Sequence, residues 1–288
     1  KSNTTASNNT GIGFGALVAN TTGTSNTAVG AYALDANTTG DTNTALGQNA
    51  LGANTTGNGN VAIGYQALIK NTTANYNVAI GENSQFAHLT GTNNVAVGAY
   101  SLDANESSSN NTAIGDSSLT SSTAGQNTAL GYASLTNLTT GTYNIGIGYN
   151  ANSSAVDSSG QCTLGDGQIS NLRCNDTSIS SLSDSRDKTD VINSPYGLEF
   201  INTVRPVQFK WETRDGNVKD GSTRIGFLAQ ELLSATDGNN AILDLVHDDN
   251  PDKLEAKYGN LLPILVKAIQ ELSAQNAELT TRITTLEG

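Results

Sequence analysis

The sequence predicts an N-terminal all-β solenoid of 17-residue coils, followed by a C-terminal α+β domain that ends in a long coiled-coil helix. Three observations support this fold class. A motif built on asparagine and glycine recurs nine times in the first half of the chain. The composition changes near residue 183, and residues 261–287 repeat apolar side chains with a heptad period. We expect a β-roll rod over 1–151, a β connector over 152–182 and a separate domain over 183–288.

The solenoid prediction depends on a repeat of the form Asn-x-(Ala/Gly)-(Ile/Val/Leu)-Gly. Its copies follow one another every 17 residues, with a single step of 16. They begin at Asn9, Asn26, Asn43, Asn60, Asn77, Asn94, Asn111, Asn127 and Asn144. So short a period indicates a solenoid, because 17 residues can hold two short strands and two turns but not two helices. In such a stack the asparagines would form an amide ladder, and the glycines would lie where the backbone has positive φ or approaches another backbone.

One coil of this kind buries very little. Each repeat offers an aliphatic residue, usually a leucine, and two small residues. We therefore expect several chains to pack side by side, most simply three around the rod axis. The segments Asn60–Gly64 and Asn94–Gly98 resemble the repeat of trimeric YadA-type adhesin heads, which form parallel β-rolls. The coil of this chain is longer, which leaves its strand and turn layout open.

Composition excludes several classes of function. A net charge of −12 argues against nucleic-acid binding, and no apolar run approaches the roughly 18 residues that would predict membrane insertion. The two cysteines, Cys162 and Cys174, and the two histidines, His88 and His247, are too few and too scattered to predict a metal site or a cofactor.

The boundary near residue 183 separates two compositions. Residues 1–182 carry 12 charged side chains, whereas the shorter segment 183–288 carries 28 of them and all four prolines. The segment Ser183–Lys188 lies at this boundary and places a serine and a lysine five residues apart. Serine becomes a nucleophile when a base removes its proton, and a lysine can do so if burial lowers its pKa. Taken alone, such a pair is more often two surface residues.

The segment from Ser183 onward resembles the C-terminal intramolecular chaperone autoprocessing domain of phage tail spikes and endosialidases. The matching motifs are Ser183-Asp184-x-Arg186-x-Lys188, residues 204–211, residues 224–232, Tyr258-x-x-Leu261 and residues 268–272. The resemblance implies that the domain drives trimer assembly and then cuts itself off, with Ser183 as nucleophile, Lys188 as general base and Ser183–Asp184 as the broken bond. The path stays open, because attack on the Leu182 carbonyl and attack by a neighbouring serine are the alternatives to attack by Ser183 on its own carbonyl. Arg186 would stabilise developing charge, or pair with Asp184 or Asp187.

Within this domain we expect a strand over 207–211 paired with one over 225–228, and a helix that starts over 229–233. The last helix has a coiled-coil seam. Positions a are Leu262, Ile269, Asn276 and Ile283, and positions d are Leu265, Leu272, Leu279 and Leu286. Isoleucine at a with leucine at d favours dimers, whereas the thin rod and the resemblance favour trimers. We predict a homotrimer.

These inferences predict the distal part of a homotrimeric phage tail fibre or spike, a virion component assembled in the host cytoplasm. Its partner would be a host-cell receptor. A glycan is one candidate, because exposed aromatic side chains such as Tyr132 and Tyr149 could stack on sugar rings, although packing of neighbouring loops is the simpler explanation. The enzymatic activity would be a single-turnover serine self-cleavage. The alternatives are a trimeric bacterial surface adhesin, or a fibre with an uncleaved structural cap.

Overall fold

The computed structural model describes residues 5–169, 172–173, 183–210 and 221–287. The chain divides into two compact units, Lys1–Ile169 and Ser170–Gly288. The first is a β-solenoid of about nine parallel coils, and the second is a small β/α region that ends in a long helix. The fold class predicted from the sequence is therefore confirmed.

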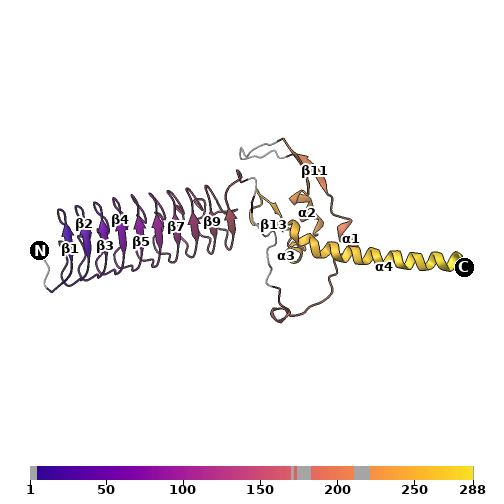
Figure 1. Cartoon of the computed structure of the whole chain (residues 1–288), viewed down its shortest axis with the longest axis horizontal. Helices are drawn as coiled ribbons and strands as arrows, with labels where there is room; N and C mark the ends of the chain where they lie inside the picture. Colours follow the sequence, from indigo (N-terminus) through magenta and orange to yellow (C-terminus); the bar gives the residue numbers. More distant parts are fainter. Residues whose placement is uncertain (1–4, 170–171, 174–182, 211–220, 288) are drawn as a thin grey trace. The chain divides into compact units, whose positions relative to one another are not determined.

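A single parallel sheet runs through the first unit (Figure 1). Its strands are β1 (Thr10–Ile12), β2 (Thr27–Val29), β3 (Thr44–Leu46), β4 (Val61–Ile63), β5 (Val78–Ile80), β6 (Val95–Val97), β7 (Thr112–Ile114), β8 (Thr128–Leu130), β9 (Ile145–Ile147) and β10 (Cys162–Leu164). Neighbouring strands pair so that equivalent repeat positions lie side by side, as Ala28 does with Ala45. Because β10 pairs with β9, the sheet continues beyond residue 151 into the predicted connector.

Each described coil contains one three-residue strand, although 17 residues have room for two, and this settles the layout that the sequence left open. The backbone is the reason: Tyr32 and Leu34 have φ angles of 57° and 51°, and alternate left-handed residues prevent a second extended segment. The turns still bond between coils. Leu34 N donates to Ala50 O at 3.0 Å, for example, and this pattern holds the coils together outside the sheet.

The predicted amide ladder is present inside the solenoid. Asn43 Nδ2 donates to Asn26 Oδ1 at 3.2 Å, and Asn43 N donates to the same oxygen at 2.9 Å. Both side chains are fully buried. The glycine prediction is also confirmed: Gly30 has a φ of 135°, and a Cβ there would lie 2.5 Å from Gly47 O. Side-chain amides and close-packed glycine backbone thus do much of what apolar side chains do in a larger core.

The second unit is built from short elements. They are η1 (Ser185–Asp187), α1 (Leu198–Ile201), β11 (Val207–Lys210), β12 (Thr223–Gly226), α2 (Ala229–Ala235), α3 (Asn240–Leu243), β13 (Val246–His247), β14 (Glu255–Ala256), η2 (Tyr258–Asn260) and α4 (Leu261–Glu287). Strands β11 and β12 pair antiparallel and α2 starts at Ala229, as expected, but β12 begins and ends two residues before the predicted strand over 225–228. The last residue of the first predicted strand, Trp211, lies outside the described residues.

The core of the second unit is small and lies around the start of α4. Buried side chains from α1, α2, the α3–β13 segment and α4 meet there; they are Phe200, Leu232, Leu243, Leu245, Val246, Leu261 and Ile264. Helix α1 packs against α4, and the later turns of α4 project past the other helices of the unit (Figure 1). Only the first turns of α4 therefore pack in the core of the unit, and the rest of the helix is exposed.

Candidate functional site

A tight turn positions the predicted cleavage residues. The 3₁₀ helix η1 is capped by Asp184, whose Oδ1 accepts a hydrogen bond from Arg186 N at 2.9 Å. Lys188 N donates to Ser185 O at 3.3 Å, which closes the turn on its other side. An aspartate at the cap satisfies a backbone donor that the short helix cannot satisfy itself. The turn places Ser183 and Lys188 at its two ends.

The turn brings the two predicted catalytic side chains together. Lys188 Nζ lies 2.5 Å from Ser183 Oγ and donates a hydrogen bond to it. Both residues are exposed in the single chain. The burial of the lysine that the predicted mechanism requires is therefore not provided within one chain. For catalysis the contact must reverse, with a neutral amine accepting the serine proton.

The structure pairs Arg186 with Asp184. Arg186 Nε lies 3.0 Å and 3.1 Å from the two carboxylate oxygens, and Nη2 lies 2.5 Å from Oδ2. These side-chain hydrogen bonds lower the pKa of Asp184 below its usual value and raise that of Arg186. Of the roles that we considered for Arg186, pairing with Asp184 is the one seen in the single chain.

The predicted coiled-coil seam is an exposed apolar stripe on α4. Leu261, Ile264 and Ala268 face the domain core and are buried. The a and d residues lie on another side: exposed fractions are 65% for Leu262 and 64% for Ile269. Leu265, Leu272, Asn276, Leu279, Ile283 and Leu286 are exposed as well. The single chain therefore leaves the whole seam uncovered.

A second apolar stripe lies on the solenoid. The middle residue of each strand from β2 to β8 is a buried alanine, so the third residue points to the opposite face of the sheet. That third residue is aliphatic in all ten strands: Ile12, Val29, Leu46, Ile63, Ile80, Val97, Ile114, Leu130, Ile147 and Leu164. Each of them is exposed or half-buried. A continuous aliphatic row thus follows the sheet on its outer face.

Sequence reasoning missed the role of Glu271, which it quoted only as part of a motif. Glu271 Oε2 accepts a hydrogen bond from Leu198 N at 2.7 Å, so a residue of α4 caps the start of α1. Lys267 Nζ lies 3.2 Å from the same carboxylate. The bond from Leu198 N is the main cause that lowers the pKa of Glu271, with a smaller contribution from Lys267. The sequence signal for this role was the position of Glu271 in the quoted motif, one helical turn after Lys267.

Two further motif residues also make contacts that the sequence did not reveal. Arg205 forms a two-point ion pair with Glu231 of α2, in which Arg205 Nε lies 3.0 Å from Glu231 Oε2. Tyr258 packs edge-on against Phe227 with ring centroids 5.4 Å apart. These contacts link the β11–β12 region to α2 and to the start of α4, and they give the quoted motifs a structural explanation.

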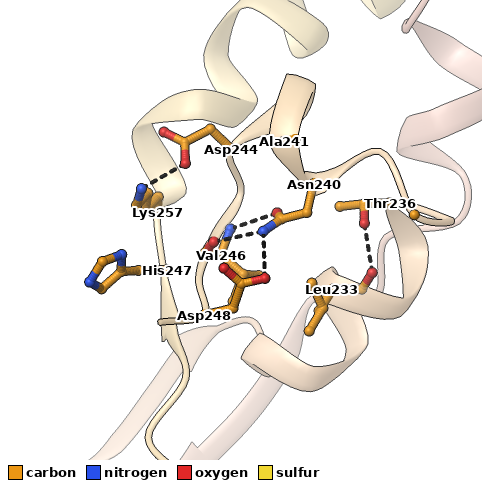
Figure 2. A pocket seen from close by; sticks show the side chains of 10 residues that line it. Leu233, Thr236, Asn240, Ala241, Asp244, Val246, His247, Asp248 and Lys257 are labelled. Carbon is orange, nitrogen blue, oxygen red and sulfur yellow. Dashed lines mark hydrogen bonds and ion pairs between the residues drawn. The ribbon is translucent and has the colours of Figure 1, made fainter. Parts of the chain in front are cut away.

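A cavity of about 470 Å³ opens beside α3 and β13. Figure 2 shows Asn240 at its wall, where Asn240 Nδ2 donates to Val246 O at 2.9 Å and to Asp248 Oδ2 at 3.2 Å. Asp244 pairs with Lys257 at 2.6 Å on the other side. The polar groups of this wall are thus engaged in holding α3 to β13. No group of three metal-binding side chains occurs in the described part of the chain.

Comparison with known proteins gives a match in the first part of the second unit. A peptidase family model described as chaperone of endosialidase matches residues 183–239, roughly a fifth of the chain, and the match begins at Ser183. This family implies autoproteolysis, and a β-solenoid followed by such a domain fits a phage tail fibre or spike with an intramolecular chaperone. Neither a curated protein nor a solved structure matches the chain. Within the described residues no helix is long and apolar enough to cross a membrane.

Proposed function

We propose that this chain is the distal part of a homotrimeric phage tail fibre or spike, and that its C-terminal domain first drives trimerisation and then releases itself by one Ser183/Lys188 cleavage. The observation that carries the proposal is the 2.5 Å contact between Lys188 Nζ and Ser183 Oγ, at the start of a domain matched by a self-cleaving family.

The proposed chemistry needs no cofactor. Neutral Lys188 accepts the Ser183 Oγ proton while Oγ attacks a carbonyl carbon, and the oxygen of that carbonyl takes the negative charge. The intermediate then collapses, the C–N bond breaks, and Lys188 returns the proton to the leaving amine. Water hydrolyses the resulting ester and regenerates the serine. Each chain carries a single such bond, so cleavage is a single-turnover event.

Ring strain bears on which carbonyl is attacked. Attack by Ser183 Oγ on its own carbonyl would close a four-membered ring, and attack on the Leu182 carbonyl would cut before Ser183. Attack by Ser183 on the Ser183 carbonyl of a neighbouring copy closes no ring and cuts the Ser183–Asp184 bond. We propose this intermolecular route, which makes cleavage dependent on assembly. N-terminal sequencing of the released fragment tests it, since a fragment starting at Asp184 is expected.

Two surfaces support the association of copies that the proposed homotrimer requires. The α4 seam exposes a and d residues over more than three heptads, and the aliphatic row on the sheet exposes one residue in every coil. Identical chains packed in parallel would bury the α4 seam and also the aliphatic row, because equivalent residues of each copy would lie opposite one another. Native mass measurement of the full chain should give three copies, and Leu272→Asp with Leu279→Asp should prevent assembly.

We further propose host attachment by the solenoid as a virion component assembled in the host cytoplasm. Tyr132 and Tyr149 are the candidate glycan contacts: their rings stack on each other between neighbouring coils with centroids 5.5 Å apart, and more than half of each residue remains exposed. Aromatic surfaces of this kind bind the apolar faces of sugars. Binding of the purified fibre to host-cell glycans, and its loss in Tyr132→Ala with Tyr149→Ala, tests the assignment.

Cleavage itself is tested on a denaturing gel. The wild-type chain should yield a fragment that corresponds to residues 184–288, while Ser183→Ala and Lys188→Ala should remain whole. Ser185→Ala is the matched control, since it alters a neighbouring serine of the same turn and should still be cut. An intact wild-type chain that is nevertheless trimeric would overturn the cleavage proposal and identify an uncleaved structural cap.

A further inference from the structure

We propose that Arg186 is a positioning residue that occupies the Asp184 carboxylate and thereby leaves Lys188 free to serve Ser183. This inference rests on the proposed self-cleavage and adds a role that the geometry of the turn suggests. Arg186 would not contact the reacting atoms. It would act through the charge balance of the turn, which contains more carboxylates than cations.

The turn presents Lys188 with competing partners. Residues 183–190 are all exposed, and the charged residues nearest to Lys188 in the chain are Asp184, Arg186, Asp187 and Asp190. Asp184 belongs to the bond to be cut, and its side chain starts one residue from Ser183. A carboxylate at this place, if unpaired, would compete with Ser183 Oγ for the lysine amine.

Such competition would slow cleavage for two reasons. An ammonium that pairs with a carboxylate points away from the serine, so the hydroxyl loses its acceptor. The carboxylate also stabilises the charged form of the lysine, and only the neutral form can take a proton. Both effects disappear when another cation occupies the carboxylate. In the structure Lys188 Nζ is hydrogen-bonded to Ser183 Oγ, and Arg186 forms an ion pair with Asp184.

The contact of Arg186 engages both Asp184 oxygens. Arg186 Nε lies within 3.1 Å of Oδ1 and Oδ2, and Nη2 binds Oδ2 as well. A guanidinium is suited to this because its planar fork matches a carboxylate, whereas an ammonium is a point charge. An exposed pair of this type contributes little to stability, so its effect should appear in the reaction rather than in folding.

Removing Asp184 is not an equivalent solution. Asp184 Oδ1 also accepts the hydrogen bond from Arg186 N that caps η1, and this turn is what sets Ser183 against Lys188. An asparagine could keep the cap without the charge, whereas an alanine could not. Asp184 and Arg186 therefore act together: Asp184 shapes the turn, and Arg186 compensates the charge of the Asp184 carboxylate.

The test measures the pH dependence of cleavage in the full chain. Uncleaved protein is recovered in denaturant and diluted into buffers between about pH 5.5 and pH 9.5. Assembly is followed by size exclusion, and cleavage by denaturing gel. Arg186→Gln should move the midpoint of the rate profile upward by about half a pH unit, and slow cleavage up to about threefold below that midpoint. Asp184→Asn combined with Arg186→Gln should return the midpoint toward that of the wild type.

Two controls complete the design. Arg186→Lys should restore only part of the effect, because it keeps the charge and loses the fork. Arg205→Gln breaks a comparable arginine–carboxylate pair with Glu231 in the same unit, and should leave the midpoint in place. A general loss of stability would affect Arg205→Gln and Arg186→Gln alike, and would not shift a pH midpoint.

The outcomes separate this inference from the proposed function. If Ser183→Ala is still cut, the proposed cleavage chemistry is wrong, and with it the role of Arg186. If Ser183→Ala stays whole but Arg186→Gln keeps the wild-type pH profile, the proposed function stands and the positioning role is overturned. The positioning role is equally overturned if the double variant with Asp184→Asn shows the profile of Arg186→Gln alone.

Discussion

Coils of the solenoid differ in the side chains at their inward positions, and comparing an apolar with a polar coil separates the interactions that define the coil from those that stabilise it. In the coils that begin at Asn26, Asn43 and Asn60, the inward positions hold leucines and alanines; they are Ala33, Leu34, Ala50, Leu51, Ala67 and Leu68. In the coil that begins at Asn77 the same positions hold Ser84 and Gln85, which are equally buried. We call this one the polar coil, and the coils that begin at Asn26, Asn43 and Asn60 the regular coils.

The polar coil also interrupts a second amide ladder inside the solenoid. Asn71 Nδ2 donates to Asn54 Oδ1 at 3.0 Å, as Asn54 does to Asn37. At the next position His88 replaces asparagine, and its ring nitrogens face Gly91 O and Asn105 O. Among the described residues, Asn71 Oδ1 and Gln85 Oε1 are then buried without a hydrogen-bond partner. Such atoms cost roughly 1–3 kcal/mol each.

The apolar core is divided at the same place. One buried cluster runs from Ala28 to Ala79 and a second from Ala96 to Leu138. Nevertheless the backbone passes through without a change of path: Gln85 N donates to Ser101 O at 2.9 Å, just as Leu51 N does to Ala67 O. The comparison teaches that backbone bonding between coils defines the coil, while inward side chains set its stability.

The largest effect is expected at the repeat glycine, whose close contact with the next coil is the same in the regular coils and in the polar coil. Gly47→Ala would place a Cβ 2.4 Å from Gly64 O at a φ of 134°, and Gly81→Ala would do the same against Gly98 O. Each should cost about 3 kcal/mol or more of unfolding free energy in denaturant titrations. Gly52→Ala is the control, since its nearest neighbour is the flexible Asp35 side chain at 3.3 Å and its change should stay below about 1 kcal/mol. A cost confined to the regular coil would contradict the shared constraint.

The next largest effect is expected when a polar residue replaces the inward leucine of a regular coil. Leu51→Gln should destabilise the solenoid by about 3 kcal/mol, because a buried leucine is lost and an amide without a full set of partners replaces it. Hydrogen exchange should locate the loss at the coils around residue 51. Tyr65→Gln changes an exposed side chain of the adjacent coil and should have little effect. Equal exchange in both variants would show that the inward position does not set stability.

The reverse substitution should sharpen the comparison from the other side. Gln85→Leu removes the unpartnered Oε1 and joins the two apolar clusters, at the cost of the bond from Gln85 Nε2 to Val78 O. We expect a gain of about 1–2 kcal/mol and slower hydrogen exchange between residues 78 and 102. A loss of stability would mean that the polar side chain fits its site better than the leucine of the neighbouring coils.

The smallest effect concerns His88 and depends on pH. Burial lowers the pKa of His88 below its ordinary 6.5, so the folded state favours the neutral ring. Above pH 6.5 the ring is neutral in both states and titration costs nothing. As pH falls below 6.5 the unfolded state binds a proton first, and stability is lost until the folded pKa is reached.

His88→Asn should remove this part of the acid dependence and give Asn71 Oδ1 its donor, with a gain of about 1 kcal/mol at neutral pH. Denaturant titrations of both proteins at about pH 8 and about pH 5 check it, because carboxylate titration is common to the two. An identical acid loss in the wild type and in the variant would contradict the role of His88.

Much of the candidate site followed from local sequence. Ser183 and Lys188 are five residues apart, and one capped turn suffices to join them, so spacing predicted the contact. The partner of Arg186 was not predictable, because Asp184 and Asp187 are both within its reach. Only the cap made by Asp184 on η1, which turns its carboxylate toward Arg186, selects between them.

The sequence alone determined the 17-residue period, the asparagine that begins each repeat and the heptad seam, because periodic structure repeats the same local conformation and the same side-chain direction. The tertiary structure decided that each described coil has one strand, that a second asparagine column bonds between coils, and that Glu271 caps α1 from 73 residues away. These features depend on left-handed backbone angles and on contacts between distant residues, for which neither propensity nor spacing carries a signal.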